Sequence, residues 1–126
     1  MLDIASAKVN EMKTKNLTGV ALDWAVCKAN GEYQFPAAEY IKVWMDSRRY
    51  SHDWAIGGPI IEREKCIATI ERLNSGDFRA QMPYDSTEDR PGRYFYGRTP
   101  LTAAMRCFVA SKLGDDVNIP DELYFQ

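Results

Sequence analysis

The sequence TPLTAAMRCFVASKLG, residues 99–114, is the most clearly marked element of the chain. Thr99 is positioned as the N-cap, Pro100 fits the first helical turn, and Gly114 provides a stop. Between these markers, apolar side chains recur along one face at helical spacing. The stretch therefore predicts a helix that buries one face against the remainder of the protein.

A β-hairpin is predicted upstream of this helix. Residues 66–73, CIATIERL, alternate in side-chain character, and the turn-forming residues 74–77, NSGD, separate them from FRAQM at 78–82. The following segment, 83–97, mixes acidic residues, Pro-Gly and three closely spaced aromatic residues. We expect it to form a long loop that ends in a short strand near residues 94–96.

A second marked helix is predicted over residues 18–29, where apolar residues again recur at helical spacing. Thr18 is placed to accept hydrogen bonds from the first-turn amides as the N-cap. The dipeptide Asn30-Gly31 supplies the left-handed stop. Both ends of this helix are therefore defined by sequence.

Two shorter elements are predicted between the second helix and the hairpin. Residues 39–45, EYIKVWM, alternate with a period of two among β-branched and aromatic residues, which is typical of a strand. Residues 59–65 are expected to form a short helix, with Pro59 at its first position and Gly58 as the cap.

These elements together predict one α+β domain, a small antiparallel sheet with a β-hairpin covered by helices, because a tight turn joins consecutive strands. The carboxyl-terminal tail is expected to cross the surface and to dock Val117 and Ile119. We expect the domain to span residues 12–122. Residues 1–11 precede a second methionine and are a candidate extension, whereas 123–126, LYFQ, match the end of a common protease-cleavage tag.

Composition and charge argue against several classes of protein. The net charge of -2 and the pI of about 5.4 supply no basic field for general binding to nucleic acid or anionic lipid. There is no secretory signal and no apolar run of about 18 residues, so we expect a cytoplasmic protein that is not membrane-bound. One histidine excludes a multi-histidine metal site, and three separated cysteines fit neither a disulfide framework nor a zinc site, so no cofactor is expected. The cysteines are Cys27, Cys66 and Cys107.

Three blocks of the sequence resemble, in order, the NinX-like family of phage and prophage proteins. They are LTGVALDWAVCKANG at 17–31, YSHDWAIGGPIIERE at 50–64 and RTPLTAAMRCFVASKLGDDVNIPDEL at 98–123. The resemblance implies a gene carried by tailed phages or prophages and a small α-β-α sandwich. It transfers no catalytic residue to this chain.

An aromatic and arginine-rich segment is the leading candidate for a contact region. Planar rings and guanidinium groups are enriched at recognition surfaces, and the same mixture suits a nucleotide, whose phosphate matches an arginine and whose base matches a tyrosine face. Acidic residues in the loop oppose a polyanion but fit a protein interface with charges of both signs. A solvated loop with internal salt bridges is an equal alternative. The candidate residues are Tyr84, Arg90, Arg93, Tyr94, Tyr96 and Arg98.

Two further motifs have both a functional and a purely structural interpretation. Gly57 and Gly58 precede the predicted helix start, where free amides attract an anion, although a double glycine more often makes a tight turn. His52 beside Asp53 could act as a general acid or base. A polar turn, with Ser51 or Asp53 as a helix cap, is the favoured interpretation of that motif.

The sequence favours a non-enzymatic phage accessory protein that binds a host or phage macromolecule in the host cytoplasm, for example to blunt a host defence. The alternative is a module that binds a nucleotide or another phosphate through Gly57, Gly58 and the arginines of residues 90–98. A third hypothesis is a hydrolytic enzyme that uses His52 with Asp53 or a cysteine. Homo-oligomer formation is left open.

Overall fold

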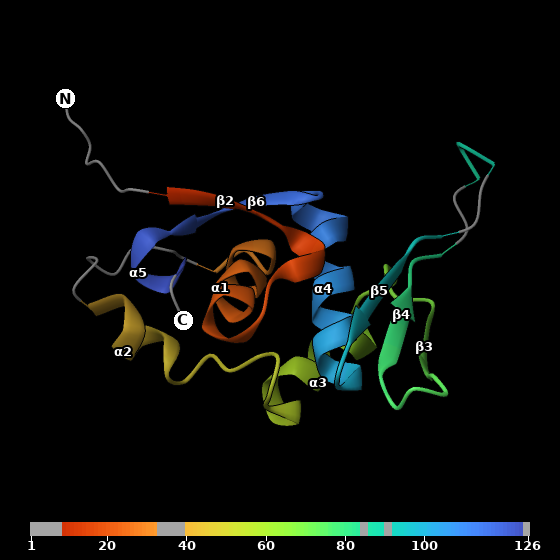
Figure 1. Ribbon diagram of the computed structural model, residues 1–126, viewed down its shortest axis with the longest axis horizontal. Helices are drawn as coiled ribbons and strands as arrows, with labels where there is room; N and C mark the ends of the chain where they lie inside the picture. The colour runs from red at the N-terminus through yellow and green to blue at the C-terminus, as the bar shows by residue number, and fades with distance from the viewer. Residues whose placement is uncertain (1–8, 33–39, 84–85, 90–91, 125–126) are drawn as a thin grey trace.

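The computed structural model describes residues 9–32, 40–83, 86–89 and 92–124 (Figure 1). It contains helices, one short 3-10 helix and strands that form antiparallel sheets. In chain order the elements are β2 (Val9–Lys13), η1 (Thr14–Asn16), α1 (Gly19–Ala29), α2 (Ile41–Met45), α3 (Trp54–Arg63), β3 (Thr69–Arg72), β4 (Phe78–Gln81), β5 (Tyr94–Gly97), α4 (Pro100–Leu113), β6 (Asp116–Pro120) and α5 (Asp121–Tyr124).

Two antiparallel sheets lie on either side of the helices α1 and α4 (Figure 1). Strands β2 and β6 form one sheet, and β3, β4 and β5 form the other, in that order. Helix α4 packs against all three strands of the second sheet and against α1, which in turn contacts β6. The α+β class and the antiparallel hairpin covered by a helix are confirmed. Helix α4 contacts strands of both sheets and α1 contacts β6, so the two helices, which also contact each other, form the centre of the domain.

Helix α4 is central because it is apolar on two faces, where one was predicted. Its larger side chains, among them Met105 and Phe108, are fully buried in the main core with α1. A second row of small residues faces the three-stranded sheet and packs against Phe95. Small side chains at this spacing let the sheet lie close to the helix. This row consists of Ala103, Cys107 and Ala110.

The predicted ends of the two marked helices are confirmed. Thr99 caps α4, since its Oγ1 accepts a hydrogen bond from the amide of Thr102 at 3.0 Å, and Gly114 follows the helix with a φ of 88°. Helix α1 begins after Thr18 and is followed by Gly31, whose φ is 77°. One detail was wrong, because the side chain of Thr18 makes no capping hydrogen bond.

The strand predicted over residues 39–45 is wrong, because the described part of this segment forms helix α2. Ile41 and Met45 are buried, whereas Val43 is 71% exposed. In a strand these three side chains would share one face, but here only the pair that lies one helical turn apart faces the core. The same apolar residues fit both periods, and packing against α1 and α5 selects the helix.

The helix predicted over residues 59–65 begins five residues earlier, at Trp54. Its N-cap is Asp53, whose Oδ1 accepts a hydrogen bond from the amide of Ala55 at 2.9 Å. Pro59 therefore lies inside the helix, where it removes one backbone donor. The expected structural role of Asp53 as a cap is confirmed, and the expected role of Gly58 as a cap is wrong.

The end segments of the described chain pair with each other. β2 and β6 run antiparallel, with Met12 opposite Val117. Val117 and Ile119 are buried, so the predicted docking of the tail is confirmed. Residues 9–11, which fall within the candidate extension, are part of β2. Leu123, the first residue of the candidate tag remnant, is fully buried in the main core.

Candidate functional site

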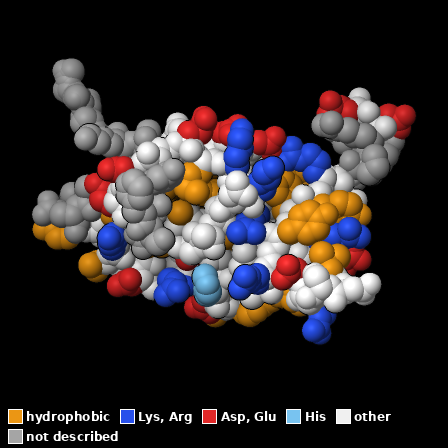
Figure 2. Space-filling view, viewed as in Figure 1, with side chains coloured by type: hydrophobic (Ala, Val, Ile, Leu, Met, Phe, Trp, Pro, Cys, Tyr) orange, Lys and Arg blue, Asp and Glu red, His pale blue; other side chains and the backbone are white. Residues whose placement is uncertain are grey.

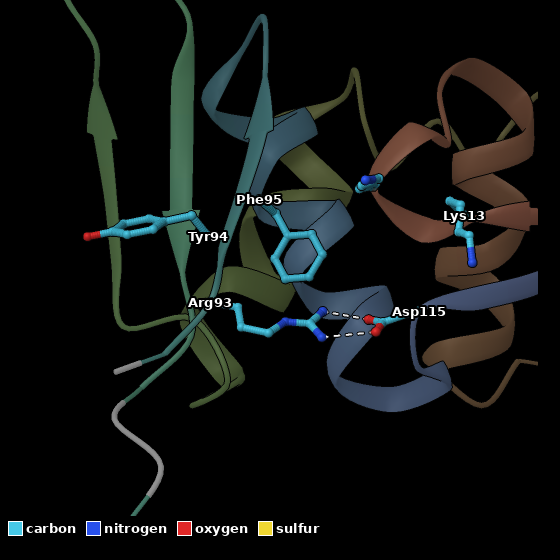
Figure 3. Close-up of a pocket in the computed structure, with 6 residues that line it drawn as sticks. Lys13, Arg93, Tyr94, Phe95 and Asp115 are labelled. Atoms are coloured by element: carbon cyan, nitrogen blue, oxygen red, sulfur yellow. Dashed lines mark hydrogen bonds and ion pairs between the residues drawn. The ribbon is translucent and has the colours of Figure 1, made fainter. Parts of the chain in front are cut away.

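Strand β5 gathers four of the residues that the sequence singled out. Arg93 immediately precedes it, Tyr94 and Tyr96 lie within it, and Arg98 immediately follows it. Phe95 is only 4% exposed, whereas Tyr94 and Tyr96 are 39% and 49% exposed, as the alternation of a strand requires. Figure 3 shows Tyr94 and Phe95 on opposite sides of the strand. The two tyrosines therefore point away from α4.

The outward side of the three-stranded sheet forms a surface that we call the open sheet face. Pairing places Glu71 opposite Arg79 and Arg79 opposite Tyr96, so their side chains share this face. Thr69, Gln81 and Tyr94 form a second row on the same face, beside the row of Glu71, Arg79 and Tyr96. The helices lie on the other side of the sheet (Figure 1). The face consists of Thr69, Glu71, Arg79, Gln81, Tyr94 and Tyr96.

Arg79 organises the open sheet face. Its guanidinium carbon lies 4.0 Å from the ring centroid of Tyr94, a cation–π distance, and its Nε forms an ion pair with Glu71. This pairing raises the pKa of Arg79. The rings of Tyr94 and Tyr96 are 6.4 Å apart. Contacts along and across the strands thus hold both tyrosines in place while leaving them accessible.

A first cavity, of about 420 Å³, lies at the start of β5 (Figure 3). Arg93 donates to both carboxylate oxygens of Asp115, at 2.5 and 3.0 Å, which lowers the pKa of Asp115 and raises the pKa of Arg93. Lys13 forms an ion pair with Asp116 at 2.8 Å. Internal acids therefore already neutralise these cations. The cavity is lined by Lys13, Lys15, Arg93, Tyr94, Phe95 and Asp115.

A second cavity, of about 410 Å³, lies at the other end of β5, and we call it the threonine–arginine cavity. Arg106 reaches it from α4 and donates to the backbone oxygens of Leu17, at 2.7 Å, and Tyr96, at 2.5 Å. The lining combines basic side chains, one acid and the hydroxyl-bearing residues Thr18, Tyr96, Thr99 and Thr102. It comprises Thr18, His52, Asp77, Tyr96, Gly97, Arg98, Thr99, Thr102 and Arg106.

His52 lies beside a buried serine in the turn before α3. Its Nδ1 lies 2.9 Å from the Oγ of Ser51, and the Ser51 amide donates to the buried carboxylate of Asp23 at 2.8 Å. Ser51 is only 2% exposed, so its hydroxyl is shielded from a substrate. The Asp53 carboxylate caps α3 by accepting a hydrogen bond from the amide of Ala55.

The glycine pair occupies a different place from the one expected. Gly57 lies within α3, and its amide donates to the carbonyl of Asp53 at 2.9 Å. The Gly57 amide is therefore not one of the free amides at a helix start that were expected to attract an anion. A Cβ on Gly57 would lie 2.4 Å from the carbonyl oxygen of Tyr50 and 2.8 Å from Cδ1 of Leu101, so this glycine allows close packing.

Two of the candidate residues, Tyr84 and Arg90, lie outside the described residues. Glu71 and Arg79 on the open sheet face and Arg106 in the threonine–arginine cavity were not among the candidate residues, although both arginines belong to the six that the sequence concentrates in residues 72–106. The hairpin turn could have predicted that Glu71 and Arg79 share a face, because the turn sets the register of β3 and β4.

The described residues lack two features that would indicate a class of protein. They contain no group of three or more His, Cys, Asp or Glu side chains placed to hold a metal ion. Within the same part of the chain, no helix has both the length and the apolar character needed to cross a membrane.

Comparison with known proteins identifies the family. The profile described as Bacteriophage P22, NinX matches residues 13–112, which include all three blocks in whole or in large part. No curated protein sequence matches the chain. Because the match covers well over half of the sequence, this phage-encoded chain belongs to the Bacteriophage P22 NinX family.

Proposed function

We propose that this protein is a non-enzymatic accessory protein that binds a host or phage protein through the open sheet face. The observation that carries the proposal is the pair Tyr94 and Tyr96, exposed on a strand and steadied by Arg79. Tyrosines held in one conformation contribute contact area at low entropic cost, and Tyr and Arg are enriched among energetically dominant interface residues.

The charges on the face favour a protein partner over a nucleic acid. Glu71 stands directly opposite Arg79, so positive and negative groups alternate across the strands. A polyanion would meet the Glu71 carboxylate on the edge strand β3, and the chain as a whole carries a net charge of -2. A protein partner with charges of both signs complements this pattern.

The reactive groups near His52 also support binding over catalysis. The Ser51 hydroxyl is buried beside the imidazole, and the Asp53 carboxylate caps α3. Burial raises the pKa of the Cys27 and Cys107 thiols to about 12, which keeps both in the weakly nucleophilic thiol form. Membership of a phage family suggests the task, which we propose is to blunt a host defence or redirect host metabolism in the host cytoplasm.

The test compares proteins recovered with the wild type and with two variants from phage-infected cells, using native mass spectrometry. The Tyr94→Ala/Tyr96→Ala double variant removes both rings. Tyr40→Ala is the matched control, because Tyr40 is 61% exposed and lies away from the sheet, beside α2. We expect a stoichiometric protein partner with the wild type and the control, and its loss with the double variant.

Retention of the same partner by the double variant would contradict the proposed surface. Recovery of the wild type as a bare chain would contradict the binding function itself. Circular dichroism and thermal unfolding of each variant show whether the fold is intact, and exposed side chains at these positions should be removable with little loss of stability.

A further inference from the structure

We propose that the threonine–arginine cavity binds a small molecule that carries both a phosphate group and hydroxyl groups, which is the chemistry of a phosphorylated sugar. The cavity has a volume of about 410 Å³, within the usual range for small-molecule sites. The cavity adjoins the open sheet face, because Tyr96 belongs to both, whereas Tyr94 and Glu71 belong to the open sheet face and do not line the cavity.

Separate parts of the chain converge on this cavity. Thr18 lies just before α1, His52 in the turn before α3, and Asp77 at the start of β4, while Gly97 and the following residues join β5 to α4. In Figure 2 basic side chains lie on both sides of the single histidine, which is pale blue. Packed helix and strand ends thus hold the lining, and they provide a preorganised cluster of polar groups.

Arg106 provides a fixed positive charge at the cavity. The side chain is half-buried, and its Nε and Nη1 atoms donate to backbone oxygens. Burial is the cause that lowers the pKa of Arg106, and no carboxylate among the described residues forms an ion pair with it. A half-buried guanidinium without a counter-ion favours an anion within reach, and phosphate matches its planar donors.

Arg98 and Thr18 contribute groups that the fold leaves unused. Arg98 is exposed at the cavity and forms no ion pair with any residue in the described ranges. The Thr18 hydroxyl stands at the N-cap of α1 but makes no capping bond. The Arg98 guanidinium can reach a phosphate as a charged donor, and the Thr18 hydroxyl as a neutral donor. By contrast, Thr99 already accepts from the Thr102 amide at 3.0 Å.

Asp77 determines which phosphate compound fits. Its carboxylate is the only acid in the lining, which also includes Arg98, Arg106 and His52. A polyphosphate filling the cavity would be repelled by this group, whereas sugar hydroxyls donate hydrogen bonds to a carboxylate. We therefore expect one phosphate beside the arginines and a hydroxyl-bearing group beside Asp77.

The experiment is isothermal titration of the full chain with ribose 5-phosphate, adenosine monophosphate, ribose and inorganic phosphate. We expect both phosphorylated sugars to bind more tightly than inorganic phosphate, and ribose not to bind. Tighter binding of the nucleotide would identify a nucleotide as the source of the phosphorylated sugar. Equal affinity for the nucleotide and ribose 5-phosphate would show that the base adds nothing and would identify a free sugar phosphate. Either result supports the proposal.

Variants locate the binding site. Arg98→Gln should weaken ribose 5-phosphate binding about tenfold, because it removes a charge-assisted contact. Lys42→Gln removes the same charge from α2, away from the cavity, and should leave affinity unchanged. Tyr94→Ala should also leave it unchanged, which separates this site from the open sheet face.

Arg106→Lys keeps the charge at the cavity but cannot reproduce the paired donors of a guanidinium, so we expect weaker binding. Thermal unfolding of this variant first shows whether it is folded. If this variant does not fold, Arg98→Gln decides the question, because Arg98 is exposed. The proposal is overturned if no phosphorylated sugar binds, if inorganic phosphate binds as tightly as ribose 5-phosphate, or if Arg98→Gln binds like the wild type.

Discussion

The guanidinium of Arg93 donates hydrogen bonds to both carboxylate oxygens of Asp115 and so links the start of β5 to the residue after the C-cap of α4. Both side chains are well exposed, at 43% and 59%, so water and salt screen the pair. We expect a double-mutant cycle with Arg93→Ala and Asp115→Ala to give a coupling free energy below about 1 kcal/mol near neutral pH.

The same pair has a predictable response to acid. Arg93 lowers the pKa of Asp115 from its ordinary value of 3.8, so the stabilisation is complete above that value and is lost as the pH falls through the lowered pKa. Urea unfolding of the four proteins of the cycle at decreasing pH measures this loss. A coupling free energy that grows on acidification would contradict the ion pair.

Adjacent glycines in α3 should respond to a methyl group to different extents. Gly57→Ala places a carbon 2.4 Å from the backbone oxygen of Tyr50, which cannot move away easily, and should lower the unfolding free energy by about 1–3 kcal/mol. Gly58→Ala is the matched control, because its nearest neighbour, a ring carbon of Trp54, lies 3.5 Å away. That variant should change the unfolding free energy much less, because the helix propensity gained by alanine is opposed by the crowding of its Cβ against the ring of Pro59. Chemical denaturation of both variants distinguishes these outcomes.

The buried carboxylate of Asp23 predicts a pH dependence opposite in sign to that of Asp115. Burial is the main cause that raises the pKa of Asp23, with hydrogen bonds from Ser51 opposing it. A carboxyl group with a raised pKa holds its proton more tightly in the folded state. Its contribution to stability is therefore largest in acid and declines as the pH rises from the ordinary value of 3.8 through the raised value.

Asp23→Asn tests this sign, because an amide oxygen still accepts from the Ser51 amide but does not titrate. The variant should gain in unfolding free energy relative to the wild type between about pH 4 and pH 7. Urea unfolding across this range supplies the measurement. A constant difference between the two proteins would show that ionisation of Asp23 costs no stability.

The three cysteines should differ in reactivity. Cys27 and Cys107 are buried, with their thiol pKa values raised to about 12, whereas Cys66 is partly exposed. We expect a thiol reagent to label Cys66 first in the native protein and the other two only on unfolding. Cys66→Ser should remove the fast phase. A fast phase that persists in this variant would mean that a buried thiol is accessible.

Local signals in the sequence were sufficient for the long helices and the hairpin. Thr99 and Gly114 mark the ends of α4, and Asn30-Gly31 marks the end of α1, because caps and left-handed stops depend on neighbouring residues alone. Helix α2 was predicted as a strand because five residues are too few to separate the two periods. There the tertiary packing of Ile41 and Met45 decides the structure.

The site was predicted in part, for the same physical reason. Strand β5 brings together Arg93, Tyr94, Tyr96 and Arg98 because they are consecutive or nearly so in the chain. Arg106 could have been noticed as the single charged residue between Pro100 and Ser111. Its carbonyl partner Leu17 is 89 residues away in the chain, so their contact depends on the tertiary fold.

The pairing of β2 with β6 bears on how the chain is made. Asn10 donates to Asp121 at 2.8 Å across a separation of 111 residues. During translation the ribosome releases the β2 segment long before the β6 segment, so β2 spends that interval as a strand without its neighbour. An unpaired strand edge invites association with other chains. Pairing of this sheet is therefore completed only after β6 has left the ribosome, and a stalled or truncated product that lacks β6 should be prone to aggregation.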